Sequence, residues 1–109
     1  PVYNKLVRDL IPEIIEADGK SCTTRILSKE EWIEAIQEKL FEEAEEVKEA
    51  DSKEEQLEEL ADMLELLHAH AHAIDATIED IEKIRQEKKI RRGGFNRAVF
   101  LIEVDEDEA

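Results

Sequence analysis

Two helix-start signals constrain the fold of this chain more than any other feature. Ser28 precedes Glu31 by three residues, and Ser52 precedes Glu55 by the same spacing. In such a capping box the serine accepts a hydrogen bond from the third helical residue, and the glutamate side chain returns one to the serine backbone. Each box opens a long segment with helical periodicity. The two predicted helices run over about residues 28–51 and 52–76.

Two further helices are expected on either side of this pair. Pro12 near the start and Gly19 just past the end predict a short helix over Ile11–Ala17, because proline suits a first turn and glycine a helix stop. A third capping box, at Thr77, opens another helix. The double glycine Gly93-Gly94 is expected to end it.

Two other segments leave room for a small β element. Cys22–Leu27 has β-branched and alternating character, and the apolar run Ala98–Ile102 is long enough to pair with it. Residues 1–104 are expected to form a single domain, and residues 105–109 an acidic tail. The predicted fold is therefore mainly α: an antiparallel helical bundle with two long helices, a third shorter helix and an optional small β element.

Four acidic side chains stand out by their position on the two long helices. On a wheel of about 100° per residue, Glu43 and Glu46 lie on the flank of the first helix's apolar stripe. On the second helix, Glu59 lies inside a wide apolar arc and Asp62 on its border. The stripe of the first helix consists of Ile33, Ile36, Leu40, Ala44 and Val47.

This placement predicts a cation site. Residues three apart project from one edge of a helix, so two antiparallel helices would face four carboxylates across a cleft. Burying unpaired carboxylates is costly, and a hard cation with oxygen ligands compensates that cost. Mg²⁺ is the expected ion, with Mn²⁺ as a substitute. The plainer alternative is accidental acidic edges on amphipathic helices, in a chain of which 41% is charged.

Charge and composition limit the classes of partner that the chain can bind. A net charge of −15 and a pI near 4.5 argue against nucleic acid, which is held by basic surfaces. No apolar run approaches the length of a membrane-spanning helix. The single cysteine, Cys22, cannot form an internal disulfide and fits a reducing, cytoplasmic setting.

The second long helix also predicts self-association. Its apolar residues cover more than half of its circumference, so a single neighbouring helix cannot bury them all. We expect a homodimer or a higher homo-oligomer with this helix near its centre.

Three motifs in order resemble a known group of enzymes. Glu42-Glu43-Ala-Glu-Glu46 and, after twelve intervening residues, Glu59-Leu-Ala-Asp62 resemble the EExxE…ExxD signature of the all-α nucleoside triphosphate pyrophosphohydrolases. That group contains MazG and phosphoribosyl-ATP pyrophosphohydrolase. The opening segment 3–13 and the late Arg-Gly-Gly-Phe at 92–95 are similar to those of small stand-alone members. The resemblance covers nearly the whole chain.

The resemblance implies a hydrolase that cleaves a nucleotide between its α and β phosphates, releasing a monophosphate and pyrophosphate. Carried over by position, Glu43, Glu46, Glu59 and Asp62 hold Mg²⁺ and form the catalytic cluster. A carboxylate of this cluster is expected to act as general base. Glu42 is a weaker catalytic candidate, because the wheel turns it outward in a monomer. The base and sugar of the substrate stay open.

Basic residues near both ends are candidates for binding the substrate's phosphates. Lys5 and Arg8 share one segment, and Arg92 and Arg97 flank the double glycine. Arginine binds phosphate oxygens bidentately, and glycine lets backbone approach them closely. For Arg92, a last-turn cation favoured by the helix dipole is the plainer interpretation.

The histidines offer a competing hypothesis. Glu65 and His68 match the Glu-x-x-His element of di-metal carboxylate bundles, and His68 with His72 has the one-turn spacing of a metal site. However, the chain has no second Glu-x-x-His, and Glu65 and His68 point about 120° away from the acidic pair on the same helix. A non-catalytic helical protein is the remaining alternative, but it would not explain the inward acids.

Overall fold

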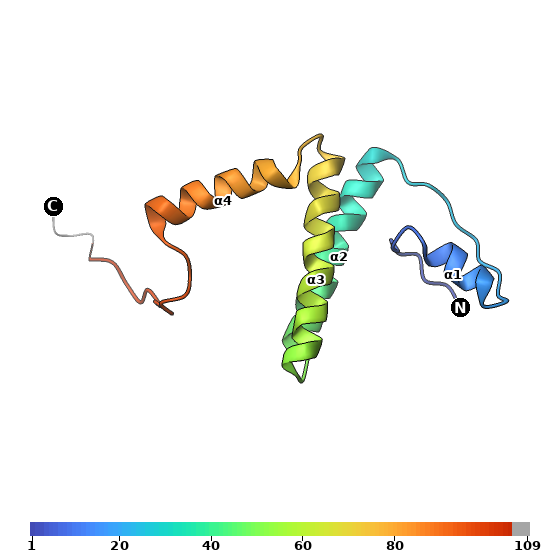
Figure 1. Ribbon diagram of the computed structural model, residues 1–109, viewed down its shortest axis with the longest axis horizontal. Coiled ribbons are helices and arrows are strands. Elements are labelled where there is room, and N and C mark those ends of the chain that lie inside the picture. The colour runs from blue at the N-terminus through green and yellow to red at the C-terminus, as the bar shows by residue number, and fades with distance from the viewer. Residues whose placement is uncertain (106–109) are drawn as a thin grey trace. The chain divides into compact units, whose positions relative to one another are not determined.

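The computed structural model describes residues 1–105, which form four α-helices and no strand. The helices are α1 (Ile11–Ala17), α2 (Lys29–Glu49), α3 (Lys53–Ala73) and α4 (Ile78–Arg92) (Figure 1). The predicted mainly α fold is confirmed. The optional β element is not: segments 22–27 and 98–102 form no strand. Within residues 1–105 neither segment has the hydrogen-bonded neighbour that a stable sheet requires. The predicted tail lies, apart from Asp105, outside the described residues.

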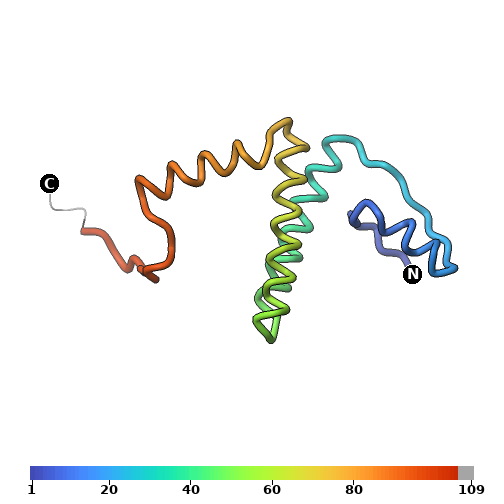
Figure 2. Tube along the Cα trace, in the orientation of Figure 1, coloured from blue at the N-terminus to red at the C-terminus, as the bar shows by residue number. Residues whose placement is uncertain are grey.

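The two long helices, α2 and α3, form an antiparallel hairpin (Figures 1 and 2). At the start of α2, Ser28 Oγ accepts from the Glu31 backbone at 3.2 Å, and Glu31 Oε1 accepts from the Ser28 backbone at 3.1 Å. At the start of α3, Ser52 Oγ accepts from Glu55 in the same way, at 3.1 Å. Both predicted helix starts are therefore confirmed. In this second cap, Glu55 Oε2 accepts a hydrogen bond from the backbone of Asp51 instead of Ser52, at 3.0 Å.

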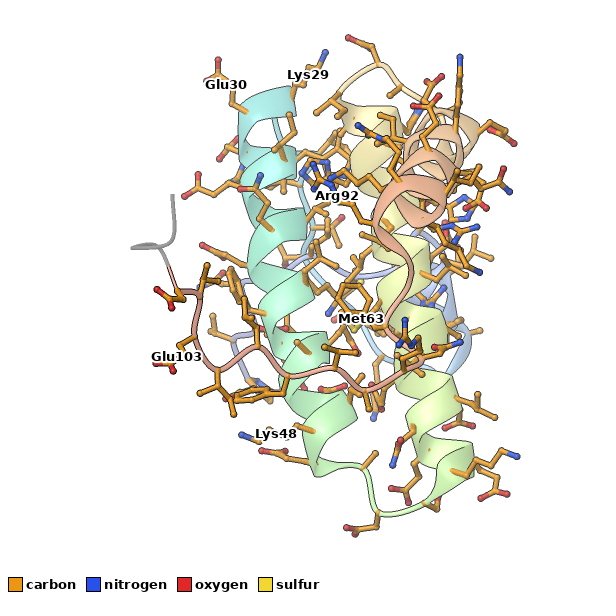
Figure 3. The ribbon with its side chains drawn as sticks, turned by 90° about the vertical axis from the view of Figure 1, so that its left-hand side faces the viewer. Lys29, Glu30, Lys48, Met63, Arg92 and Glu103 are labelled. Atoms are coloured by element: carbon orange, nitrogen blue, oxygen red, sulfur yellow. The ribbon has the colours of Figure 1, made fainter. Side chains whose placement is uncertain are left out.

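Three charges at the ends of α2 suit the helix dipole, while Lys29 at its first position opposes it. Figure 3 shows Lys29 and Glu30 at the start of α2 and Lys48 toward its end. Glu30 and Glu31 occupy the first turn, and Lys48 the last. Negative charge at the N-terminal end and positive charge at the C-terminal end both stabilise a helix.

The core lies between α2 and α3. Ile36 of α2 is fully buried and packs in a cluster with Leu66 and Ala73 of α3. Partly buried apolar side chains complete the cluster: Leu6, Trp32, Ile33, Leu40 and Ala69. The N-terminal segment thus joins the hairpin through Leu6. The predicted stripe on α2 is wrong at one position, because Ala44 is exposed.

The chain divides into two compact units, one of residues 1–78 and one that begins at Glu79. In the first unit, α1 ends as predicted at Ala17, and just past its end Gly19 has a φ of +82°, which few other residues adopt. In the second, Gly93 ends α4 with the same φ and donates to the Lys89 carbonyl at 2.8 Å. None of the helices in residues 1–105 has the length and apolar character needed to span a bilayer.

Candidate metal centre

Three carboxylates converge between the two long helices. Glu43 and Glu46 project from α2, one turn apart, and Glu59 projects from α3. One oxygen of each lies within 4.8 Å of the others. Glu43 is only 7% exposed, Glu59 is half-buried and Glu46 is exposed. The helical spacing brings the first pair together, and the hairpin adds the third.

Two oxygens of this cluster have no protein partner. Glu43 Oε2 and Glu59 Oε2 are buried, and neither has a hydrogen-bond partner within residues 1–105. Buried polar atoms are nearly always paired, and an unpaired buried carboxylate is especially costly. A hard divalent cation would satisfy both oxygens and neutralise the mutual repulsion of the three acids. The donor set therefore fits Mg²⁺, which takes oxygen ligands and keeps open positions for substrate.

Crowding of the acids shifts two of their pKa values upward. Hydrogen bonding to Glu46 and to Glu43, followed by burial, favours the protonated form of Glu59 and raises its pKa to about 8. Burial raises the pKa of Glu43, and the charge of Glu46 adds to the rise. Carboxylates that share one site cannot all ionise freely. Without a cation the cluster therefore retains a proton near neutral pH.

The stability of the metal-free protein should depend on pH with a definite sign. The folded state binds a proton at Glu59 up to about pH 8, whereas a glutamate in the unfolded chain loses it near pH 4.3. The stabilising contribution is therefore complete below pH 4.3 and is lost as pH rises through 8. In EDTA we expect the Tm to fall between pH 5 and pH 8.5, as measured by circular dichroism.

The rest of the acidic chain repels itself more at high pH too, so a variant must isolate the cluster. Glu59→Gln should show a shallower decline in EDTA than the wild type does. Saturating Mg²⁺ should also reduce the decline, because the cation stabilises the ionised acids. A Tm that rises over this range in EDTA, or an identical decline in Glu59→Gln, would contradict the assignment.

Asp62 is placed differently from the other three acids. It lies on α3, half-buried, and is not part of the group within 4.8 Å. Its Oδ1 instead accepts a hydrogen bond from Arg8 Nη2 at 2.6 Å. Sequence reasoning named both residues but not their pairing. The structure thus brings three of the four candidate ligands together and pairs the fourth with a candidate phosphate-binding residue.

The remaining candidates are exposed. Glu42 forms an ion pair with Lys39 at 3.8 Å. Lys39 was not named from the sequence, although its spacing of three residues from Glu42 on one helix signals such a pair. Lys5 Nζ lies 6.0 Å from the centre of the Tyr3 ring. Arg92 and Arg97 are exposed in the second unit.

The three histidines lie outside the carboxylate group. Within residues 1–105, the three glutamates are the only group of three or more potential ligands so close together. His70 Nε2 lies 3.3 Å from Gln37 Nε2, and the His72 ring meets Trp32 edge-on at 5.9 Å. His68 is exposed. No histidine of the described part of the chain belongs to a group of three or more potential ligands.

Comparison with known proteins agrees with the acidic motif. The model of the phosphoribosyl-ATP pyrophosphohydrolase family matches residues 4–89. An uncharacterized protein of Mycolicibacterium smegmatis is 44% identical over 54 residues, which make up 50% of this chain and 55% of that protein. The chain thus spans about half the length of that relative. No solved structure matches the chain. Since the family match covers most of the chain, including both long helices and all the clustered acids, the protein belongs to the phosphoribosyl-ATP pyrophosphohydrolase family.

Proposed function

We propose that this protein is a Mg²⁺-dependent nucleotide pyrophosphohydrolase that cleaves between the α and β phosphates. The family supports a nucleotide pyrophosphohydrolase activity. The acidic cluster supports the metal dependence, because three carboxylate oxygens within 4.8 Å suit a hard cation. Mn²⁺ should substitute, since it prefers the same ligands.

One observation carries this proposal. Glu43 is 7% exposed, and its Oε2 has no partner among the described residues. An exposed acidic cluster would need no explanation, because solvent and salt stabilise it. A buried carboxylate with a free oxygen that faces two further acids is costly unless a cation binds there.

The candidate residues form two binding groups in the proposed reaction. The proposed cation ligands are Glu43, Glu46, Glu59 and Asp62. A bound Mg²⁺ would neutralise phosphate charge and orient the substrate. The phosphate-binding candidates are Lys5, Arg8, Arg92 and Arg97.

Water attacks the α or the β phosphorus, and the bond from that phosphorus to the oxygen that bridges the two phosphates breaks. The products are pyrophosphate and a nucleoside monophosphate. A carboxylate of the cluster accepts the water's proton as general base. Glu42 is the weaker candidate for assisting this transfer, because its side chain is 53% exposed and paired with Lys39.

Product identification tests this function most directly. The purified protein is incubated with Mg²⁺ and a panel of nucleoside triphosphates plus phosphoribosyl-ATP, and pyrophosphate is assayed against orthophosphate. We expect pyrophosphate and a nucleoside monophosphate in equal amounts, with no release in EDTA. Orthophosphate as the first product, or release that persists in EDTA, would contradict the proposal. The panel also identifies the preferred base and sugar.

The proposed enzyme is a homodimer or a higher homo-oligomer. Leu57, Leu60, Leu64 and Leu67 of α3 form an exposed row, called here the leucine seam. Their alternating spacing of three and four residues is that of a helix-pairing seam. A second copy of the chain is the proposed partner.

The carboxylate site and the histidine-centred alternative make opposite predictions for a substitution of His68. The side chain is exposed and lies outside the carboxylate group, so His68→Ala should leave the Mg²⁺-dependent rate within about twofold of wild type. Steady-state pyrophosphate release measures this. Inactivation of a folded His68→Ala variant would favour the histidine site instead.

A further inference from the structure

The N-terminal segment delivers a positive charge to one of the proposed cation ligands. Arg8 Nη2 donates to Asp62 Oδ1 at 2.6 Å, across 54 positions of sequence. Two residues earlier, Leu6 packs against the core between α2 and α3. Leu6 therefore holds the segment against the hairpin, so that the guanidinium of Arg8 reaches α3.

Arg8 also experiences the field of the other acids. Its hydrogen bond to Asp62 raises the pKa of the guanidinium, and the charges of Glu65 and Glu43 act in the same direction. Glu43 is the most buried member of the carboxylate cluster. The contact that places the guanidinium at the proposed site is the one with Asp62, a proposed cation ligand.

The pair can separate without any unfolding. The side chains of Arg8 and Asp62 are 57% and 39% exposed, so water can replace each partner. Ion pairs this exposed contribute little to stability, because water screens the two charges. A divalent cation that recruits Asp62 would therefore outcompete Arg8. The released guanidinium would then be free to bind the substrate's phosphates, which it fits bidentately.

We propose that Arg8 is an exchangeable counter-ion: it neutralises Asp62 in the metal-free protein, yields Asp62 to the divalent cation, and then binds a phosphate of the nucleotide. This inference rests on the proposed metal-dependent function. An exchangeable pair and a fixed structural pair have opposite effects on the affinity for the cation. A structural pair that orients Asp62 would support cation binding, whereas an exchangeable one competes with it.

Mn²⁺ affinity of the nucleotide-free protein tests that sign. Titration followed by electron paramagnetic resonance gives the Kd for Mn²⁺ without any turnover. Arg8→Gln should lower this Kd about threefold, because the competing charge is gone. Lys20→Gln is the matched control. It removes one positive charge from the same unit, at an exposed side chain whose partner is Asp18 at 3.9 Å, and should leave the Kd unchanged.

A double-mutant cycle ties the effect to Asp62. In the Asp62→Asn background, adding Arg8→Gln should no longer tighten Mn²⁺ binding, because the carboxylate for which Arg8 and the cation compete is gone. An equal tightening in that background would show only a general charge effect and would overturn the exchange. An unchanged or raised Kd in Arg8→Gln itself would overturn it too.

The second half of the exchange is read from nucleotide kinetics. Arg8→Gln should raise the KM for the nucleotide about tenfold, because a charge-assisted contact to phosphate is lost. The same variant would thus bind the cation more tightly and the substrate more weakly. An unchanged KM would overturn phosphate binding by Arg8.

Two outcomes separate this inference from the proposed function. If the wild type binds no Mn²⁺, both are overturned. If it binds Mn²⁺ and Arg8→Gln does not tighten binding, the exchange alone is overturned. Should Arg8→Gln fail to fold, Arg8→Lys serves instead. Lysine pairs less well with a carboxylate, so it should tighten Mn²⁺ binding by less, and unchanged binding would again contradict the exchange.

Discussion

Glu59→Gln is expected to lower pyrophosphate release at least about 100-fold and to leave the helical hairpin folded. Mutating groups that only orient metal ligands already costs about 10–100-fold, so loss of a ligand should cost more. The fold should survive, because the substitution removes a half-buried carboxylate whose Oε2 has no partner in the described chain. Initial rates at saturating Mg²⁺ and circular dichroism measure the two effects separately.

Glu45→Gln is the matched control for this variant. Glu45 lies on α2 beside Glu46 but is exposed and outside the carboxylate group, so its rate should stay within about twofold of wild type. A Glu59→Gln variant with the wild-type rate would remove Glu59 from the ligand set. A large loss in Glu45→Gln would show that the helix faces were assigned wrongly.

Helix starts and the glycine-marked ends of α1 and α4 could be predicted from the sequence, whereas the end of α3 could not. A start is marked locally, and the caps at Ser28 and Ser52 form as expected. The end of α3 was predicted near Ala76, but the helix stops at Ala73. There Asp75 adopts a φ of +62°, a left-handed conformation that non-glycine residues seldom take and that the sequence pattern did not signal.

In the candidate site, too, features marked by local sequence could be predicted and contacts between distant segments could not. Helical periodicity alone was enough to single out Glu43 and Glu59, since burial follows from the face of one helix. The pairing of Arg8 with Asp62 could not be found in this way. It joins an irregular segment to a helix 54 positions away, and no periodic pattern connects the two. The expected strands failed for a related reason, because a strand depends on a partner that local sequence does not specify.

Leu64→Lys is expected to dissociate the proposed assembly. Leu64 is 52% exposed in the single chain and lies in the middle of the leucine seam. On a wheel of about 100° per residue, the seam is centred about 120° from Glu59, so it points away from the face that packs on α2. In a symmetric dimer both copies lose a leucine and gain a charge. The dimer Kd should rise at least about 100-fold. Sedimentation velocity over a range of concentrations measures it.

The choice of lysine separates the loss of apolar contact from simple repulsion. The chain carries a net charge of −15, so lysine lowers the repulsion between two copies and would favour association if charge decided the outcome. Ile84→Lys is the matched control: Ile84 is 54% exposed on α4 and should leave the mass unchanged. A Leu64→Lys variant that keeps the wild-type mass would place the interface elsewhere. A wild type at 12.6 kDa throughout would overturn the proposed homo-oligomer.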